Sequence, residues 1–328
     1  MSSLRGSSIL ITGGSGSFGR AFVRFALANL DPRRIIIFSR DELKQYEMRH
    51  ALGGDSRLRW ALGDIRERDA LMRAMFGVDY VVHAAALKQV DTAEYHPYEY
   101  VKTNVVGSQN VIDAATAGGV RKVVAISTDK ASSPINLYGA TKMVADKLFT
   151  AADDAASSVD TRLSVVRYGN VMGSRGSVVP LFRSLAEREA SLPITDKRMT
   201  RFWISLAEAV AFVVSTFDVM QGGELFVPLL PSVKIAELAE AIYPGGPTFE
   251  VGCRPGEKLH EEMIAKENSR RTFRMGDRYV VLSSTRSPDL ALPHGCAPVP
   301  HDFAYRSDTN EAWLTVDDLR LMLQRGEI

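Results

Sequence analysis

The sequence predicts an α/β protein with a doubly wound parallel sheet and a smaller C-terminal part. Three observations lead to this fold class. Short aliphatic runs alternate with stretches long enough for crossover helices, a glycine-rich turn follows the first run, and beyond Gly173 the alternation dissolves into turn-rich sequence. Continuous apolar strands that alternate with helices are typical of a parallel sheet covered on both faces.

In chain order, the first elements are a strand, a helix and a second strand. Residues 9–11 form an aliphatic run, Phe18, Phe22 and Phe25 share one helix face, and residues 35–37 form the next run. The same patterns recur as far as the end of the chain. Further strands are expected at 58–62, 80–83, 123–127 and 163–166, and helices at 67–75, 98–117, 137–152, 179–188, 205–217 and 316–323.

Composition and charge exclude several classes of protein. The 328 residues include 40 Lys and Arg against 39 Asp and Glu, a net charge of +1. This balance argues against a binder of nucleic acid or of anionic membranes. No apolar run is long enough to cross a bilayer and no apolar leader opens the chain, so we expect a cytoplasmic protein. Cys253 and Cys296 cannot form a disulfide framework, and we expect two reduced thiols.

The glycine-rich turn reads Thr12-Gly-Gly-Ser-Gly-Ser-Phe-Gly19 and places Gly13, Gly16 and Gly19 three residues apart, between a strand and a helix. Glycine suits a backbone that turns tightly and approaches a pyrophosphate closely, and the helix N-terminus adds amide donors and positive potential. In this context the turn predicts a Rossmann-type dinucleotide-binding domain rather than a plain tight turn.

The end of the second strand discriminates between NAD and NADP. Arg40, with Lys44 one helical turn later, favours NADP because a guanidinium suits the extra phosphate. Asp41 and Glu42 keep NAD as the alternative, since a carboxylate accepts hydrogen bonds from the ribose hydroxyls. Asp64, after the third strand, is expected to hold the adenine edge, and a helix cap is its alternative role.

Tyr138 and Lys142 stand four residues apart, which places a phenol and an ammonium on one helix face. We expect the nearby cation, helped by a positively charged nicotinamide ring, to lower the pKa of the phenol and favour the phenolate. The pair can then take a proton from a sugar hydroxyl as hydride leaves the same carbon. Such a pair is common on ordinary helices, so the indication comes from its combination with the glycine loop.

Beyond these motifs, ordered blocks resemble one family from about residue 7 to the end of the chain. The chain is similar to the inverting UDP-N-acetylglucosamine 4,6-dehydratases that begin pseudaminic acid synthesis, within the extended short-chain dehydrogenase/reductase superfamily. The blocks include Ser127-Thr-Asp-Lys130, Asn136-Leu-Tyr-Gly-Ala-Thr-Lys142, Arg167-Tyr-Gly-Asn-Val171, Met199-Thr-Arg-Phe202 and Arg254-Pro-Gly-Glu-Lys-Leu259.

The resemblance implies an internal redox cycle that ends in UDP-2-acetamido-2,6-dideoxy-β-L-arabino-hexos-4-ulose. NADP would take hydride from sugar carbon 4 with Tyr138 as the base, while Lys142 holds the nicotinamide ribose. Lys130 would remove the proton from carbon 5, Asp129 would assist loss of the carbon-6 hydroxyl, and Thr128 would bond the carbon-4 oxygen. Hydride then returns to carbon 6, and a proton reaches carbon 5 from the opposite face.

Two of these roles need unusual protonation states. Lys130 must be neutral to act as a base, so we expect burial and neighbouring positive charge to lower its pKa. Asp129 must carry a proton, which requires a raised carboxyl pKa or a relayed proton. Lysine at this position is the feature that most separates the family from the retaining dTDP-glucose dehydratases, which have glutamate there.

Further residues are expected around the cofactor and the substrate. Arginines grip phosphate bidentately and a carboxylate can accept from two ribose hydroxyls, although each such residue could also be an ordinary surface charge. The expected cofactor residues are Gly13, Ser15, Gly16, Ser17, Phe18, Gly19, Arg40, Lys44, Asp64, Ile65, Ala84, Ala85, Ala86, Asn104, Tyr138 and Lys142. The expected substrate residues are Lys88, Asn170, Arg175, Ser177, Val178, Thr195, Arg201, Arg254 and Glu257.

We expect a Rossmann domain at residues 1–177, to which 200–228 return, and a substrate-binding part at 178–199 and 229–328. None of the six histidines has metal-ligand spacing, so no catalytic metal is expected, and His83 is expected to be a satisfied strand histidine. The partners implied are a UDP-sugar and further copies of the chain in a homo-oligomer, with no nucleic acid and no membrane.

The sequence departs from the family pattern at two places near the expected substrate wall. Asp91 stands where members usually have proline, and Ser132 and Ser133 precede Pro134. These departures concern which sugar the site accepts more than which type of reaction it carries out. Two alternatives therefore remain: a dehydratase or epimerase of the same fold that acts on another nucleotide sugar, and a non-catalytic NADP-binding sensor. Tyr138 argues against a branch of relatives in which methionine replaces this tyrosine.

Overall fold

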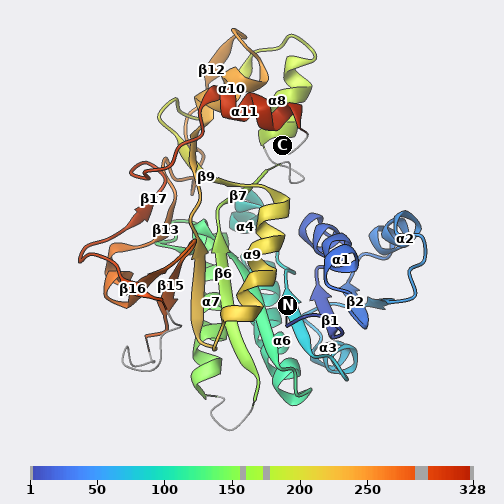
Figure 1. The fold of residues 1–328 in the computed structure, drawn as a ribbon. Helices are drawn as coiled ribbons and strands as arrows, with labels where there is room; N and C mark the ends of the chain where they lie inside the picture. The colour runs from blue at the N-terminus through green and yellow to red at the C-terminus, as the bar shows by residue number, and fades with distance from the viewer. Residues whose placement is uncertain (1–2, 156–159, 173–177, 285–294, 326–328) are drawn as a thin grey trace.

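Among the residues that the structure describes, a ten-stranded sheet forms the centre of the fold (Figure 1). The computed structural model describes residues 3–155, 160–172, 178–284 and 295–325. Arg175 and Ser177, which we expected at the substrate, lie outside the described residues.

Six consecutive strands on one side of this sheet are parallel, in the order β3-β2-β1-β4-β5-β6. The order reverses between β1 and β4, and ligands of such sheets bind beyond the carboxyl ends of the strands at the reversal. The expected α/β class with a Rossmann-type sheet is confirmed. The strands are β1 (Ser8–Thr12), β2 (Arg34–Ser39), β3 (Leu58–Leu62), β4 (Tyr80–His83), β5 (Lys122–Thr128) and β6 (Arg162–Tyr168).

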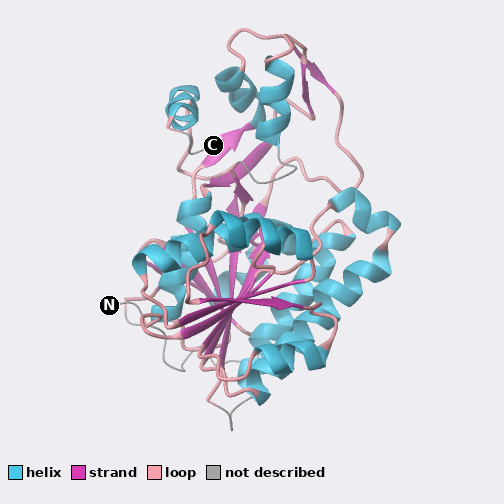
Figure 2. Cartoon of the chain, turned by 90° about the vertical axis from the view of Figure 1, so that its right-hand side faces the viewer, coloured by secondary structure: helices cyan, strands magenta, loops and turns pink. Residues whose placement is uncertain are grey.

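Helices cover both faces of the sheet (Figures 1 and 2). On one face α9 packs against α1, β5 and β6, and on the other α6 packs between α3 and α7. The helix expected at 98–117 is divided: α5 (Pro97–Tyr100) continues into a π-helical turn (Val101–Val106) and then α6 (Gly107–Ala117). The remaining helices of this part are α1 (Ser17–Asn29), α2 (Glu42–Ala51), α3 (Arg68–Ala74), α4 (Val90–Tyr95), α7 (Leu137–Ala155) and α9 (Leu206–Val219).

The rest of the sheet takes in one strand from the segment 200–228, whose return to the first domain we expected, and three strands that we expected in the smaller part. β10 (Glu224–Pro228) pairs parallel to β6, and a late hairpin, β14 (Thr272–Met275) with β15 (Arg278–Leu282), adds antiparallel beyond it. β16 (Ala297–Pro298) ends the sheet on that side. Sequence periodicity located none of these late strands, because such short runs become strands only by pairing with an edge that a distant segment presents.

The smaller part stands above the carboxyl ends of the parallel strands (Figure 1). Its core packs Leu238 and Ala241 of α10 against Leu319 of α11 and Val179 of α8. The helices are α8 (Val178–Ala186), α10 (Ile235–Ile242) and α11 (Val316–Gln324). A three-stranded sheet has the order β11 (Ser232–Lys234), β9 (Thr200–Ile204) and β7 (Asn170–Val171). Two strand pairs accompany it: β8 (Leu192–Ile194) with β12 (Thr248–Glu250), and β13 (Glu262–Ile264) with β17 (Tyr305–Arg306).

The hydrophobic core lies between the parallel strands and their helices. Ile9, Leu10 and Ile11 are fully buried, as the continuous aliphatic run predicts. Cys253 and Cys296 are both free thiols. Within the described ranges, no helix is long and apolar enough to cross a membrane.

Candidate active site

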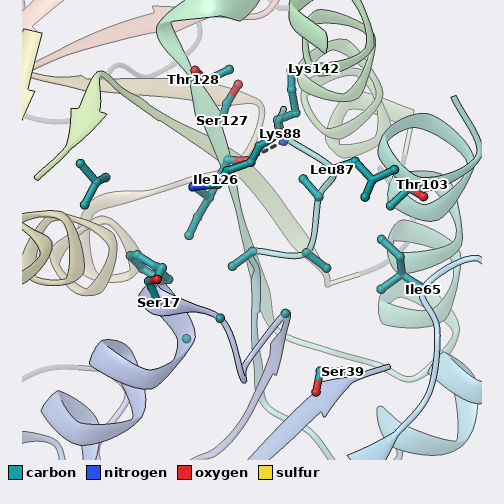
Figure 3. A pocket seen from close by; sticks show the side chains of 18 of the residues that line it. Ser17, Ser39, Ile65, Leu87, Lys88, Thr103, Ile126, Ser127, Thr128 and Lys142 are labelled. Carbon is teal, nitrogen blue, oxygen red and sulfur yellow. Dashed lines mark hydrogen bonds between the residues drawn. The ribbon is translucent and has the colours of Figure 1, made fainter. Parts of the chain in front are cut away.

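Two cavities that share lining residues lie at the carboxyl edge of the parallel strands. The first has a volume of about 670 Å³ and extends from the glycine loop to Tyr138, and the second has about 520 Å³ and continues toward Arg254. Lys88, Lys130 and Asn170 line both. Figure 3 shows the first, with Ser17 and Ser39 below and Thr128 and Lys142 above. Every expected cofactor residue except Asn104 lines the first cavity, as do Thr128, Asp129 and Lys130.

The glycine loop leaves no room for a side chain at its first position. Gly13 has a φ of +66°, and a Cβ atom there would lie 2.9 Å from the backbone of Ala85. The loop therefore packs against the chain that leaves β4, and its backbone faces the cavity at the beginning of α1. Such a cradle of backbone next to a helix N-terminus fits a pyrophosphate.

The end of β2 presents Arg40 beside the same cavity. The Arg40 side chain is 55% exposed, and its guanidinium lies 3.8 Å from Asp64 Oδ2. Asp41 is used locally: it accepts from the backbone N–H of Lys44 at 2.9 Å as the cap of α2, and its other oxygen pairs with Lys44 Nζ at 2.6 Å. One of the two carboxylates that could have accepted from a ribose hydroxyl is thus already engaged.

Asp64 lines the cavity and also holds its own loop. Its Oδ1 accepts from the backbone N–H of Arg66 at 3.0 Å, and its Oδ2 accepts from Arg66 Nε at 2.9 Å. Burial raises the pKa of Asp64, but the hydrogen bonds from Arg66 outweigh burial and lower it overall. The helix cap that we kept as an alternative is wrong: Glu67 is the N-cap residue of α3, and Asp64 instead holds the turn before it.

Asn104 is not among the described residues that line the first cavity. Its Oδ1 accepts from the backbone N–H of Leu87 at 2.9 Å, and its Nδ2 donates to the Leu87 carbonyl at 3.0 Å. Asn104 thus fixes the segment that carries Lys88. Burial lowers the pKa of Lys88.

Tyr138 and Lys142 both project from α7 into the first cavity. Lys142 Nζ donates to the Ile126 carbonyl at 2.7 Å (Figure 3). Burial lowers the pKa of Lys142, and the Asp146 carboxylate opposes this. Burial raises the pKa of Tyr138 to about 12, although the Lys130 ammonium and a hydrogen bond with Thr128 pull it down. In this structure burial dominates, and the cation that acts on the phenol is Lys130 and not Lys142.

Asp129 and Lys130 form a short 3₁₀ turn (Asp129–Ala131) directly after β5. The Asp129 side chain is 1% exposed, and its Oδ1 accepts from the Thr128 hydroxyl at 3.0 Å and from Lys130 Nζ at 3.1 Å. A second carboxylate, Glu261 Oε1, lies 3.0 Å from the same Nζ.

This arrangement reverses the expectation for Lys130. Burial alone would lower the pKa of the ammonium, but the carboxylates of Asp129 and Glu261 outweigh burial and the repulsion of Arg201 and raise it. The expected neighbouring positive charge is present in Arg201, yet the two carboxylates, 3.1 and 3.0 Å from Lys130 Nζ, act on the ammonium more strongly. Lys130 is therefore an ammonium in this structure.

Glu261 is the functional candidate that the sequence did not indicate. It follows the Arg254–Leu259 block and precedes β13. Nothing in its local sequence pattern shows that it faces Lys130, which lies in the turn after β5. A second network was missed as well: Arg167 donates to Asp146 Oδ2 at 2.9 Å, and the Ser127 hydroxyl donates to the same oxygen at 2.8 Å.

Those expected substrate residues that the structure describes divide into two groups. Lys88, Asn170, Arg201, Arg254 and Glu257 line the second cavity. Among the described residues, Val178 and Thr195 line neither cavity. Arg201 donates to the carbonyls of Thr200, Leu259 and Lys258 at 2.7 to 3.0 Å, so the backbone fixes most of its guanidinium.

One of the two departures from the family pattern lines this second cavity, and the other follows Lys130, one of its lining residues, by two positions. Asp91 lines it from the first turn of α4. Ser132 and Ser133 donate their hydroxyls to Glu262 Oε1 at 3.0 and 2.7 Å, which ties the turn after Lys130 to β13.

His83 is a satisfied strand histidine, as expected. It is 2% exposed, its Nδ1 lies 2.8 Å from the Thr12 hydroxyl, and its Nε2 lies 3.3 Å from the Ser108 hydroxyl. Burial, with a smaller contribution from Lys142, lowers the pKa of His83 to about 3. No group of three or more His, Cys, Asp and Glu residues suited to a metal occurs in the parts of the chain that the structure describes.

Two curated relatives cover most of the chain. The UDP-N-acetylglucosamine 4,6-dehydratase (inverting) of Campylobacter jejuni is 49% identical over 98% of this chain and 98% of its own length. A protein of Rickettsia canadensis named UDP-glucose 4-epimerase is 43% identical over 86% of this chain and 85% of its own length.

Solved structures share the fold. Pen from Bacillus thuringiensis matches with a TM-score of 0.91 and 35% identity, over 99% of this chain and all of its own (100%). A dTDP-glucose 4,6-dehydratase from Streptomyces venezuelae, solved with NAD bound, matches with a TM-score of 0.69 and 26% identity over 77% of this chain and 86% of its own.

The family described as "Polysaccharide biosynthesis protein" matches residues 9–283. This range takes in the glycine loop, the Asp129–Lys130 turn, the Tyr138–Lys142 pair and Glu261, the groups that the fold gathers around the two cavities. The chain therefore belongs to the polysaccharide biosynthesis protein family and, within it, to the family of the inverting UDP-N-acetylglucosamine 4,6-dehydratases.

Proposed function

We propose that this chain is a hydro-lyase that converts UDP-N-acetylglucosamine into UDP-2-acetamido-2,6-dideoxy-β-L-arabino-hexos-4-ulose, with inversion at carbon 5. The observation that carries the proposal is the gathering of Asp129, Lys130, Tyr138 and Lys142 in one cavity with the glycine loop. Dehydration between carbons 5 and 6 needs a base and an acid besides the pair that serves carbon 4, and these four residues supply both sets. The name and the identity of the Campylobacter relative support the same reaction.

The proposed cofactor is NADP, with NAD as the less favoured alternative. The backbone cradle at Gly13 fits the pyrophosphate, and Arg40 lies where a 2′-phosphate would be bound. Asp41 already caps α2 and pairs with Lys44, which weakens the case for NAD. When bound, the nicotinamide would supply the acceptor for the hydride of carbon 4 and the source of the hydride for carbon 6.

The residues of the chain would move the protons. Tyr138 would accept the proton of the carbon-4 hydroxyl, and Thr128 would bond the carbon-4 oxygen. Lys130 would take the proton from carbon 5, and Asp129 would deliver a proton to the departing carbon-6 hydroxyl. The raised pKa of Tyr138, about 12, requires further stabilisation of the phenolate when the site is filled, and a cationic ring next to the phenol would supply it.

The second cavity would hold the nucleotide end of the substrate. Arg254 and Glu257 line it, with Lys88 at its junction with the first cavity. Cations there suit a diphosphate and the carboxylate suits a ribose. Arg201 would serve chiefly to shape the wall, since the carbonyls of Thr200, Leu259 and Lys258 hold it.

Proton NMR of the purified protein with UDP-N-acetylglucosamine in deuterated water tests the reaction. We expect a new carbon-6 methyl signal, deuterium at carbon 5 and inverted ring couplings. Unchanged substrate would contradict the proposal and make Asp91, in the second cavity, the first residue to examine.

A second candidate is an epimerase of the same fold, which the name of the Rickettsia relative favours. Epimerisation at carbon 4 needs Tyr138 but gives Asp129 and Lys130 no proton to move at carbon 5. In the same NMR experiment, epimerisation would change the carbon-4 couplings without producing a methyl signal. A non-catalytic NADP-binding sensor would change neither.

Other expectations stay predictions. These are the division into a Rossmann domain at 1–177 with 200–228 and a substrate-binding part at 178–199 and 229–328, assembly into a homo-oligomer, location in the cytoplasm, and the absence of a catalytic metal. The pairing of β10 with β6 supports the return of 200–228 to the first domain. The pairing of β15 with β10 supports moving the hairpin 272–282 there as well.

A further inference from the structure

A buried carboxylate that the proposed reaction does not use lies against the proposed base. The Glu261 side chain is 1% exposed, with its Oε1 3.0 Å from Lys130 Nζ and 3.8 Å from Arg201 Nε. Asp129 Oδ1 lies 3.1 Å from the same Nζ. The Lys130 ammonium is therefore held between two buried carboxylates.

Two hydrogen bonds with Ser307 fix the backbone of Glu261. Its backbone N–H donates to the Ser307 hydroxyl at 2.9 Å, and its carbonyl accepts from the Ser307 N–H at 2.8 Å. Glu261 Oε2 is buried and has no hydrogen-bond partner among the described residues. A carboxylate left partly unpaired in the interior is unfavourable for folding, so its presence beside a reactive lysine points to a role in the site.

The two roles proposed for the turn after β5 each need a change of protonation. Lys130 must lose a proton to become a base, and Asp129 must gain one to become an acid. Because Lys130 Nζ and Asp129 Oδ1 are 3.1 Å apart, within hydrogen-bond distance, a single transfer between them satisfies both needs.

Resting on the proposed dehydration, we propose that Glu261 is a positioning residue, which holds the Lys130 ammonium beside Asp129 so that Lys130 becomes a base by passing its proton to Asp129 and not to water. In this step an N–H bond of Nζ breaks and an O–H bond forms on Oδ1, leaving a neutral amine and a neutral carboxylic acid. The amine then takes the carbon-5 proton, and the acid proton leaves as water with the carbon-6 hydroxyl. Both groups end as ammonium and carboxylate, as they began.

Other charged groups surround this pair. Arg201 of β9 faces Glu261, Tyr138 of α7 lies close enough for the Lys130 charge to act on its phenol, and Lys258 is a further cation near Lys130. Glu257 lies 3.6 Å from Arg201 and offsets part of its charge. Removing the negative charge of Glu261 therefore leaves the pair surrounded mainly by cations, and the pair should release its proton at lower pH.

Glu261→Gln tests this directly, because glutamine keeps an oxygen that can accept from Lys130 but carries no charge. The first readout needs no substrate: the pKa of Lys130 is measured by NMR of protein labelled at lysine Cε, with the resonance assigned from Lys130→Arg. We expect the transition to fall by about 1–3 pH units, the range for losing an opposite charge at this distance. Glu261→Asp, which withdraws the charge by one methylene, should give a smaller shift in the same direction.

Glu262→Gln is the matched control. This neighbouring carboxylate contacts Ser132 and Ser133, so its loss should leave the Lys130 transition in place. A Lys130 transition that is unchanged in both Glu261 variants, or that moves as far in Glu262→Gln, would overturn the proposal. Because this measurement uses no sugar, its result is independent of the proposed substrate.

The second readout is turnover against pH. Above the transition of the pair, the amine is neutral but no acid remains, so wild-type dehydration should fall while deuterium still enters carbon 5 of recovered sugar. In Glu261→Gln, the pH above which dehydration falls while carbon-5 exchange continues should be lower, by the same shift that NMR gives for the Lys130 transition. Dehydration and carbon-5 exchange that fall together in the wild type would rule out proton transfer to Asp129, whereas no methyl product at any pH would count against the proposed function.

Discussion

The protonation of Tyr138 depends on burial more than on its partner in sequence. Burial raises its pKa to about 12, and the cation that lowers it is Lys130, whereas Lys142 donates to the Ile126 carbonyl. At the residue scale, a motif of two residues four positions apart thus places two groups on one helix face without deciding which charge acts on which group. The same holds for Asp41, whose carboxylate is engaged by the first turn of α2.

Tyr138→Phe should lower turnover of UDP-N-acetylglucosamine by about 10²- to 10⁴-fold, the usual contribution of a positioned acid or base. Binding of NADP should change little, because the phenol is one of many groups around the cavity. Methyl formation by NMR measures the first effect and fluorescence titration the second. Retained turnover would contradict the role of the tyrosine.

Arg40→Ala should weaken NADP binding by about 10- to 100-fold, the equivalent of about 1.5–3 kcal/mol for hydrogen bonds to a charged group. NAD binding should change far less, since NAD has no 2′-phosphate. Calorimetric titration with each dinucleotide measures both. Arg24→Ala, on the exposed face of α1, is the control and should affect neither. Equal losses for the two dinucleotides would show that Arg40 does not select NADP.

At the scale of elements, the glycine loop combines a left-handed backbone conformation at Gly13 with close packing of Gly13 against the backbone of Ala85. Gly13 and Gly53 have similar φ angles of +66° and +64°, but a Cβ would be crowded only at Gly13, by Ala85. The turn after β5 is a second such element, because it places Asp129 and Lys130 at the carboxyl edge of the sheet.

Gly13→Ala and Gly53→Ala separate these two effects. Both should destabilise the fold by about 1–2 kcal/mol, because alanine is unfavourable in the left-handed region. Only Gly13→Ala should also lose dinucleotide affinity, by about tenfold or more, since its Cβ displaces the loop from the chain after β4. Urea unfolding and dinucleotide titration measure the two quantities. Equal dinucleotide affinity in the two variants would mean that the loop does not form the pyrophosphate cradle.

At the scale of the whole molecule, the central sheet joins segments from both ends of the chain. β1 and β4 lie side by side at its centre, and His83 of β4 bonds Thr12 of β1. Because His83 is buried, global unfolding is coupled to its protonation. The late hairpin β14–β15 extends the same sheet, so unfolding is expected to involve the last third of the chain as well.

The free energy of unfolding should therefore depend on pH through His83. Its pKa is lowered to about 3 in the folded chain, against about 6.5 when unfolded, so the stabilisation is complete above pH 6.5 and is lost as the pH falls toward 3. The expected slope is about 1.4 kcal/mol per pH unit in this window. Urea unfolding at several pH values should show this contribution removed in His83→Gln and kept in His50→Gln, on α2. Equal slopes in all three proteins would contradict it.

Much of the site could be predicted because its parts are local in sequence. The glycine loop, the Asp129–Lys130 turn and the Tyr138–Lys142 pair each lie within one strand end or one helix turn, and parallel strands bring their carboxyl ends to one edge. The same rule about strand ends predicted the expected cofactor residues that line the first cavity. Arg201 was harder to interpret, because only the fold shows that backbone carbonyls hold its guanidinium.

The sequence by itself determined the fold class, the family and the neighbours that lie along one strand end or helix. Only the tertiary structure decided the charge of Lys130, the pairing of the late hairpin with β10 and the capping of α2 by Asp41. The physical reason is that a pKa depends on burial and on charges within a few ångströms. At Lys130 one of those charges, Glu261, comes from a segment more than a hundred residues away, which Ser307 holds in place.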